Sequence, residues 1–307
     1  MEKAQGEELM RAVREGQPAA IIVNTRSRRG EALLRRAQSG LQQRGIRIGE
    51  AYAIREPSVI REAVRAIVSR EYPLVVVAGG DGTVTSIVGE LAYRDVILGL
   101  IPSGTGNSFA RTVGIPLSLE DTLDVIANGR VANVDLGKVD GTYFANVTTI
   151  GLSVAAARFT PSLLKRYLGS VAYVLTGIYR LFSHNAFLCR LEIDGEPHVF
   201  QTHELIIANG RYFGKTLLVS DASVTNQQLV ICSMAPLDRW KLGTLFITLL
   251  RQREATLSGL EFLTGHQIRV ETEPSQRLSL DGEIHGETPA TFSIAPGALK
   301  IMVPGEA

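Results

Sequence analysis

Cysteine is scarce in this 307-residue chain, which has only Cys189 and Cys232. Each lies in an apolar, strand-like run, and neither has metal-ligand spacing to a second ligand residue. The pattern therefore predicts buried, reduced thiols in a cytoplasmic protein, with a disulfide as the less favoured alternative. The five histidines show no metal spacing either, and the sequence assigns them no role.

An excess of charge of one sign is also absent. The chain has 32 basic and 31 acidic residues, for a net charge of +1. This balance argues against nucleic-acid binding driven by bulk charge, so any basic patch must be local.

Long apolar runs are missing as well. The longest candidates, 170–182 and 242–250, fall short of the roughly 18 apolar residues that span a bilayer. The N-terminal stretch from Met1 to Gly16 is charged and lacks the apolar core of a signal peptide. We therefore expect a soluble, cytoplasmic protein that touches a membrane from one side at most, as a peripheral protein at its inner face.

Two glycine-rich loops each follow an apolar run that reads as a buried strand. The run 74–78 ends at Gly79-Gly80-Asp81-Gly82-Thr83, and the run 96–101 ends at Pro102-Ser103-Gly104-Thr105-Gly106-Asn107. Glycines allow a polyphosphate to approach backbone N–H groups, and the carboxylate of Asp81 suggests Mg²⁺ or a substrate hydroxyl. One such loop is often only a tight turn, but two at one sheet edge predict a ligand-binding crevice.

Strands and helices alternate through the first part of the chain. Strands are expected at 18–23, 46–54, 74–78 and 96–101, with helices after each of them. Ser58 and Ser118 are expected to cap the helices that run to about 70 and 127. The pattern predicts a doubly wound, three-layer α/β domain over residues 1–132, with its core at 18–130.

After residue 130 the sequence changes to short strands separated by turns such as Asp140-Gly141, Asp194-Gly195 and Asn209-Gly210. The expected strands are 131–139, 142–149, 186–193, 198–208, 217–219, 229–235, 267–271, 276–280 and 290–294. This half reads as a β-sandwich domain over 133–297, with inserted helices near 161–182 and 238–252. Residues 298–307 are expected to return to the first domain, and the ligand site to lie between the two domains.

Three elements together resemble the diacylglycerol kinase catalytic-domain family, which includes bacterial lipid kinases and sphingosine kinases. They are Gly79 to Thr83, the run from Pro102 to Arg111, and Leu280-Asp281-Gly282-Glu283. The first element is shared with the distantly similar NAD kinases and discriminates poorly. The second is more specific to the lipid kinase branch, and the resemblance covers the chain from about Ala19 to Val303.

The resemblance implies an ATP- and Mg²⁺-dependent kinase that phosphorylates a lipid hydroxyl, such as that of diacylglycerol. Glu283 or Asp281 is the implied proton acceptor, with Asp281 also an Mg²⁺ ligand and Asp81 a further catalytic residue. Without the resemblance, Asp281-Gly282-Glu283 reads first as a hairpin turn, as Asp194-Gly195-Glu196 does. The residues implied to bind the nucleotide are Asn24, Thr25, Gly79, Gly80, Asp81, Gly82, Thr83, Val84, Thr85, Gly104, Thr105 and Asn107.

The chain departs from the family pattern at several positions. Ser108 stands where many members have aspartate, and Ala53 where relatives often have a nucleotide-contacting threonine. Asn226-Gln227 replaces an Asp-Gly pair that binds a structural Mg²⁺ in relatives. A neutral amide holds Mg²⁺ more weakly than a carboxylate, so we predict that this metal is absent. Arg211 matches a loop lining the family's cleft, but reads equally as a solvated surface residue.

The lipid side is the least readable part of the sequence. The apolar stretch 152–182, interspersed with Lys165, Arg166 and Arg180, is more often core than lipid site. Part of it, with 238–253, is also a candidate acyl-chain pocket or membrane-facing edge, in which case binding to anionic vesicles should weaken steeply with salt. A homodimer is a further open alternative.

Two other functions also stay open. One is a same-fold kinase of a small soluble alcohol, similar to an NAD kinase. The other is a non-catalytic nucleotide or lipid sensor, against which the carboxylates of Asp81, Asp281 and Glu283 speak.

Overall fold

The computed structural model describes residues 2–25, 30–154, 185–213, 216–217, 219, 222–234 and 260–305. The chain divides into two units: the first comprises 1–146, 209–227 and 294–307, and the second 147–208 and 228–293. The helices expected near 161–182 and 238–252 lie outside the described residues. The sequence-based domain limits at 132 and 297 stay a prediction.

A parallel sheet forms the centre of the first unit. Its strands lie in the order β2 (Ile48–Ile54), β1 (Ala19–Asn24), β3 (Leu74–Gly79) and β4 (Ile97–Pro102). The end of β18 (Ala290–Val303) pairs with β4 in parallel, through Lys300 and Ile301. β5 (Arg130–Val139) pairs with β18 and forms a hairpin with β6 (Thr142–Phe144).

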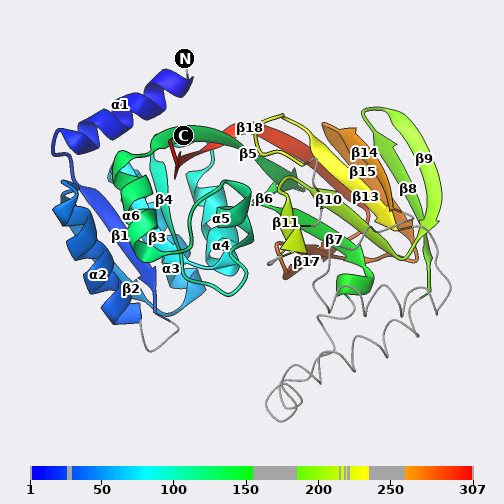
Figure 1. The fold of residues 1–307 in the computed structure, drawn as a ribbon. Coiled ribbons are helices and arrows are strands. Elements are labelled where there is room, and N and C mark those ends of the chain that lie inside the picture. Colours follow the sequence, from blue (N-terminus) through cyan, green and yellow to red (C-terminus); the bar gives the residue numbers. More distant parts are fainter. Residues whose placement is uncertain are drawn as a thin grey trace, which may run out of the picture. The chain divides into compact units, whose positions relative to one another are not determined.

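Helices cover both faces of this sheet (Figure 1). Helices α1 (Glu2–Arg14), α2 (Gly30–Gln43) and α6 (Leu119–Asn128) share a core with Ile21 and Val76. On the opposite face, α3 (Pro57–Ser69), α4 (Asp81–Leu91) and α5 (Ser108–Thr112) pack on Ile22 and Val77. Successive strand residues point to opposite faces, and both faces are apolar, so the predicted doubly wound, three-layer domain is confirmed.

The two predicted helix caps differ in outcome. Ser118 is the N-cap of α6, and its Oγ accepts the Asp121 N–H at 3.3 Å, as predicted. The prediction that Ser58 caps α3 is wrong, because α3 begins at Pro57 with Glu56 in the N-cap position. Proline at the first helical position keeps the preceding residue extended, so the N-cap lies two residues before Ser58.

The strands of the second unit are antiparallel and belong to two sheets, one of which is the ten-stranded sheet that also includes β1 to β4. One pairs β9 (Glu196–Thr202), β8 (Phe187–Ile193), β15 (Gln267–Glu273) and the first residues of β18. The other has the order β14 (Leu260–Gly265), β13 (Leu229–Met234), β10 (Glu204–Ala208), β7 (Val147–Gly151), β16 (Arg277–Leu280) and β17 (Glu283–Glu287). A Cβ atom on Gly151 of β7 would lie 2.8 Å from the Phe187 ring of β8, so the two sheets contact each other at this point. The predicted β-sandwich is confirmed.

Several strands of the β-rich half differ from the prediction. The stretch expected as one strand at 198–208 is two strands in different sheets, divided at His203. The stretch 142–149 also holds two strands, β6 and β7. β14 and β17 were not predicted. For β17 the reason is that all five of its residues are exposed, so its sequence lacks the apolar alternation of a half-buried strand. A short ribbon of β11 (Tyr212–Phe213) and β12 (Thr216–Leu217) belongs to the first unit.

Both cysteines are free and buried, as predicted. Burial raises the pKa of the Cys189 thiol and of the Cys232 thiol to about 12, which keeps both protonated and unreactive at neutral pH. Within the described ranges, no helix is long and apolar enough to cross a membrane.

Candidate nucleotide and transfer site

The first glycine loop connects β3 to α4. Gly80 is the N-cap residue of α4, and Asp81 is its first helical residue. Gly79 has to be glycine for steric reasons, because a Cβ atom there would lie 2.5 Å from the Thr83 Oγ1. Asn24 Nδ2 donates to the same Oγ1 at 2.9 Å. The end of β1 is thereby bonded to the loop that ends β3.

The second glycine loop connects β4 to α5, and Asn107 closes it on itself. The Asn107 Oδ1 accepts the Gly104 N–H at 2.9 Å, while its Nδ2 donates to the Gly104 carbonyl at 3.0 Å. The backbone of Asn107 is left-handed, with φ 53°, which asparagine tolerates better than most residues. Both polar groups of this buried side chain thus hold the loop, while Ser103, Gly104 and Thr105 are exposed.

The two glycine loops touch each other. A Cβ atom on Gly104 would lie 2.6 Å from the Gly80 Cα, and one on Gly80 would lie 2.9 Å from the Gly104 Cα. The Ser103 N–H donates to the Gly79 carbonyl at 3.0 Å. These contacts require glycine at both positions, and they bring two stretches of glycine backbone to one edge of the sheet. Such a surface of backbone without Cβ atoms suits the close approach of phosphate groups.

Asp81 lies where the two loops meet. Its side chain is half-buried, and its Oδ1 accepts the Phe109 N–H of α5 at 3.4 Å. Across the described ranges, no three Asp, Glu, His or Cys residues come together in a group that would hold a metal ion. A single carboxylate fits Mg²⁺ that arrives with nucleotide phosphates, because protein-bound Mg²⁺ commonly takes only one or two carboxylates.

The remaining predicted nucleotide ligands have mostly structural contacts. The Thr25 N–H donates to the Ile54 carbonyl at 2.8 Å, extending the β1–β2 pairing. Val84 is buried in the core between α4 and the sheet. The Thr85 Oγ1 donates to the Asp81 carbonyl at 3.0 Å. The first unit therefore brings Asn24, Thr25 and both glycine loops to one sheet edge, with Val84 turned into the core.

Asp281 and Gly282 form the two-residue turn between β16 and β17 in the second unit. Leu280 pairs with Glu283, and both turn residues have positive φ, 49° and 96°, as in a type I′ hairpin. The Asp281 Oδ1 accepts the Val147 N–H at 2.9 Å. Glu283 is exposed at the start of the edge strand β17. The two carboxylates are therefore separated by a single glycine, one in the turn and one on the strand that follows it.

The loop that replaces the family's Asp-Gly pair is held by a buried carboxylate. The Asp135 Oδ2 accepts the Gln227 N–H at 2.8 Å, and its Oδ1 accepts the Gly297 N–H at 2.8 Å. The Asp135 N–H donates to the Val224 carbonyl at 2.7 Å. Asn226 is exposed. The donor set at this loop therefore fits Mg²⁺ poorly, and absence of the metal stays a prediction.

Sequence reasoning assigned no role to a polar cluster beside the second glycine loop. Thr112 Oγ1 donates to Asn146 Oδ1 at 3.0 Å, and the Asn146 carbonyl accepts the Asn209 N–H at 2.7 Å. Asn209 Nδ2 also donates to the Asp135 carbonyl at 2.9 Å. Two features of the sequence could have indicated this cluster: Thr112 directly follows the motif that ends at Arg111, and residues 209–210 are an Asn-Gly pair.

Comparison with known proteins gives matches over both halves. Residues 18–139 match the family described as the diacylglycerol kinase catalytic domain, and 146–303 match the YegS C-terminal NAD kinase beta sandwich-like domain. Diacylglycerol kinase of Staphylococcus epidermidis is 30% identical over 79% of this chain and 78% of its own length. That of Staphylococcus haemolyticus is 30% identical over 93% of this chain and 88% of its own.

A crystal structure of a diacylglycerol kinase from Bacillus anthracis has the same fold. Its TM-score is 0.72 at 20% identity, over 94% of this chain and 97% of that one. At that identity the likeness supports the fold alone. The matches to both halves and the 30% identity over most of two relatives carry the assignment further: the chain belongs to the diacylglycerol kinase family, whose members are phosphotransferases with an alcohol group as acceptor.

Proposed function

We propose that this protein is an ATP- and Mg²⁺-dependent lipid kinase that phosphorylates the hydroxyl of diacylglycerol or of a related lipid. The observation that carries the proposal is the contact between the two glycine loops through Gly80 and Gly104. The family assignment supports transfer to an alcohol, and the exposed loop 103–105 offers a backbone surface to the donor's phosphates.

In this proposal Asn24, Thr25 and the two glycine loops bind the nucleotide, Asp281 would be a ligand of its Mg²⁺, and Asp81 would be a further catalytic carboxylate. When bound, Mg²⁺ would neutralise part of the phosphate charge during transfer. Asn24 and Asn107 would keep the loops in place before the nucleotide arrives, so little reorganisation is needed on binding. Glu283, exposed on β17, would accept the hydroxyl proton, with the neighbouring Asp281 as the alternative acceptor.

The test is transfer of labelled γ-phosphate from ATP·Mg²⁺ to a panel of micellar lipids and soluble alcohols, NAD among them. We expect a labelled lipid product. Glu283→Gln should lower turnover about 10²- to 10⁴-fold, the range of a general base. Glu287→Gln is the matched control, because Glu287 is exposed on the same strand, and it should leave turnover unchanged.

A second matched pair separates turn geometry from chemistry. Asp281 and Asp194 occupy the same position of similar Asp-Gly turns, with φ 49° and 51°. Asp281→Asn should abolish most transfer, whereas Asp194→Asn should change only stability. A labelled soluble alcohol without labelled lipid would contradict the lipid assignment, and nucleotide binding without any transfer would favour a sensor.

A further inference from the structure

Arg111 carries a guanidinium that has no acidic partner in the described part of the chain. It lies on α5, half-buried, and its Nε donates to the Gly106 carbonyl of the second glycine loop at 3.1 Å. Some other arginines of the first unit are paired with carboxylates, such as Arg44 with Asp124 at 2.6 Å and Arg65 with Glu90 at 2.8 Å, whereas Arg61 bonds only a backbone carbonyl among the described residues. A half-buried charge normally has a counter-charge, so the lack of one at Arg111 points to a ligand that supplies it.

Arg211 has the same arrangement in a neighbouring loop. Its Nε donates to the Ala222 carbonyl at 2.9 Å, the side chain is exposed, and no carboxylate pairs with it among the described residues. In both arginines the Nε is bonded to a backbone carbonyl. In each guanidinium, the edge formed by its two Nη groups is thereby left for another partner.

Asn146 brings the segments that carry these two arginines together. Thr112, next to Arg111, donates its Oγ1 to the Asn146 Oδ1 at 3.0 Å. The Gly210 N–H, next to Arg211, donates to the Asn146 carbonyl at 2.9 Å. A Cβ atom on Gly210 would lie only 3.0 Å from the Thr112 Oγ1. Residues 111–112 and 210–211 are therefore neighbours within the first unit.

We propose that Arg111 and Arg211 form a guanidinium pair that binds the oxygens of a phosphoryl group beside the second glycine loop. The inference rests on the proposed function for its location. A guanidinium matches phosphate bidentately, and bonding of Nε to a fixed carbonyl orients the side chain before the ligand binds. The phosphoryl group is either the terminal phosphate of the nucleotide or the phosphate monoester of the lipid product.

Calorimetric titration of the full chain tests the pair. The ligands are ATP, ADP and AMP with excess Mg²⁺, inorganic pyrophosphate, and a short-chain phosphatidate below its micellar concentration. The variants are Arg111→Gln, Arg211→Gln and Arg111→Lys. Arg61→Gln is the matched control, because the Arg61 Nε also donates to a backbone carbonyl, that of Ser86 at 3.0 Å.

We expect each glutamine variant to weaken binding of the phosphoryl ligand about 10- to 100-fold, the loss typical of one charge-assisted hydrogen bond. Arg111→Lys should restore only part of the affinity, because ammonium keeps the charge but lacks the bidentate fork. Arg61→Gln should bind like the unaltered protein. Loss confined to ATP, ADP and pyrophosphate assigns the pair to the nucleotide, whereas loss confined to phosphatidate assigns it to the lipid product.

Unchanged binding of all these ligands in Arg111→Gln and Arg211→Gln would overturn the inference. An equal loss for AMP and ATP accompanied by a lower unfolding temperature would also overturn it, since it would mean a purely structural role. A different result would contradict the proposed function without contradicting the guanidinium pair. If pyrophosphate binds through the arginines but no lipid is ever phosphorylated, the guanidinium pair stands and the lipid kinase proposal falls.

Discussion

At the scale of single residues, Asn107 shows how one side chain can shape a loop. Its amide bonds both the N–H and the carbonyl of Gly104, and its own backbone is left-handed. Asn107→Ala removes both bonds and adds strain at a position with positive φ. We expect a loss of about 1 to 3 kcal/mol in the free energy of unfolding, measured by urea denaturation.

Asn107→Asp separates the two hydrogen bonds. Aspartate keeps the acceptor for the Gly104 N–H and tolerates the left-handed backbone, but it cannot donate to the Gly104 carbonyl. Its loss should be smaller than that of Asn107→Ala. Equal stability of Asn107→Ala and the unaltered protein would show that the loop does not depend on this side chain.

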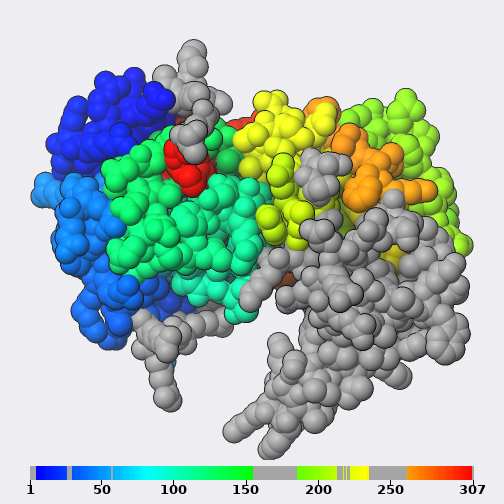
Figure 2. Space-filling view, in the orientation of Figure 1, coloured from blue at the N-terminus to red at the C-terminus, as the bar shows by residue number. Residues whose placement is uncertain are grey.

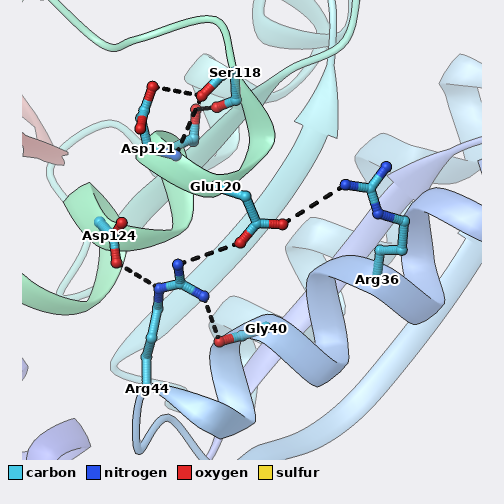
Figure 3. Close-up of polar contacts among 8 residues, drawn as sticks. Arg36, Gly40, Arg44, Ser118, Glu120, Asp121 and Asp124 are labelled. Atoms are coloured by element: carbon cyan, nitrogen blue, oxygen red, sulfur yellow. Dashed lines mark hydrogen bonds and ion pairs between the residues drawn. The ribbon is translucent and has the colours of Figure 1, made fainter.

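At the scale of elements, α2 and α6 are held together by an ion cluster (Figure 3). Arg44 of the turn after α2 bonds Asp124 at 2.6 Å and Glu120 at 3.3 Å on α6, and its Nη1 reaches the Gly40 carbonyl at 3.1 Å. The hydrogen bond from Arg44 lowers the pKa of Asp124 below its usual value. The two helices adjoin at the molecular surface, as the space-filling view shows (Figure 2).

Close approach of α2 to α6 depends on Gly40. A Cβ atom there would lie 2.5 Å from the buried Leu123 Cδ1, whereas one on Gly89 of α4 would only touch Tyr143 at 3.7 Å. Alanine is favoured over glycine in helices by about 1 kcal/mol, so Gly89→Ala should stabilise the protein. Gly40→Ala should be less stable than Gly89→Ala by about 1 to 3 kcal/mol, the usual cost of overpacking. Equal thermal unfolding of the two variants would contradict this account.

At the scale of a whole folding unit, Glu204 couples stability to pH. Its carboxylate is buried between the strands of the second unit, and its Oε2 accepts the Ser153 N–H at 2.9 Å. Burial raises the pKa of Glu204 from 4.5 to about 8, although the bonds from Ser153 act in the opposite direction. The folded state therefore binds a proton that the unfolded state releases between about pH 4.5 and 8.

The sign of the pH dependence follows from that proton. Where the folded state holds more protons, the free energy of unfolding falls as pH rises, by at most about 1.4 kcal/mol per pH unit for one group. Unfolding followed from pH 5 to 8 should thus show Glu204→Gln gaining stability over the unaltered protein as pH increases. Glu192→Gln, at an exposed position of β8, should run parallel to the unaltered protein. Parallel curves for Glu204→Gln would show that Glu204 is ionised throughout.

The local sequence by itself determined much of the secondary structure of this protein. Apolar runs predicted the parallel strands, Ser118 predicted a helix cap, and Asp-Gly pairs predicted the hairpins at 140–141 and 194–195. These features depend on the backbone preferences of a few adjacent residues, so a short stretch of sequence is enough to predict each of them. The family motif indicated which loops to propose for nucleotide binding, but not how their side chains are bonded.

Tertiary structure decided the rest, because each remaining feature needs a partner that is distant in the sequence. Asn24 contacts Thr83, Gly80 contacts Gly104, and Asn146 joins the segments of Arg111 and Arg211. The edge strand β17 forms because β16 pairs with it, although its own residues are all exposed. Such pairings depend on chain topology, and no periodicity within one segment specifies them.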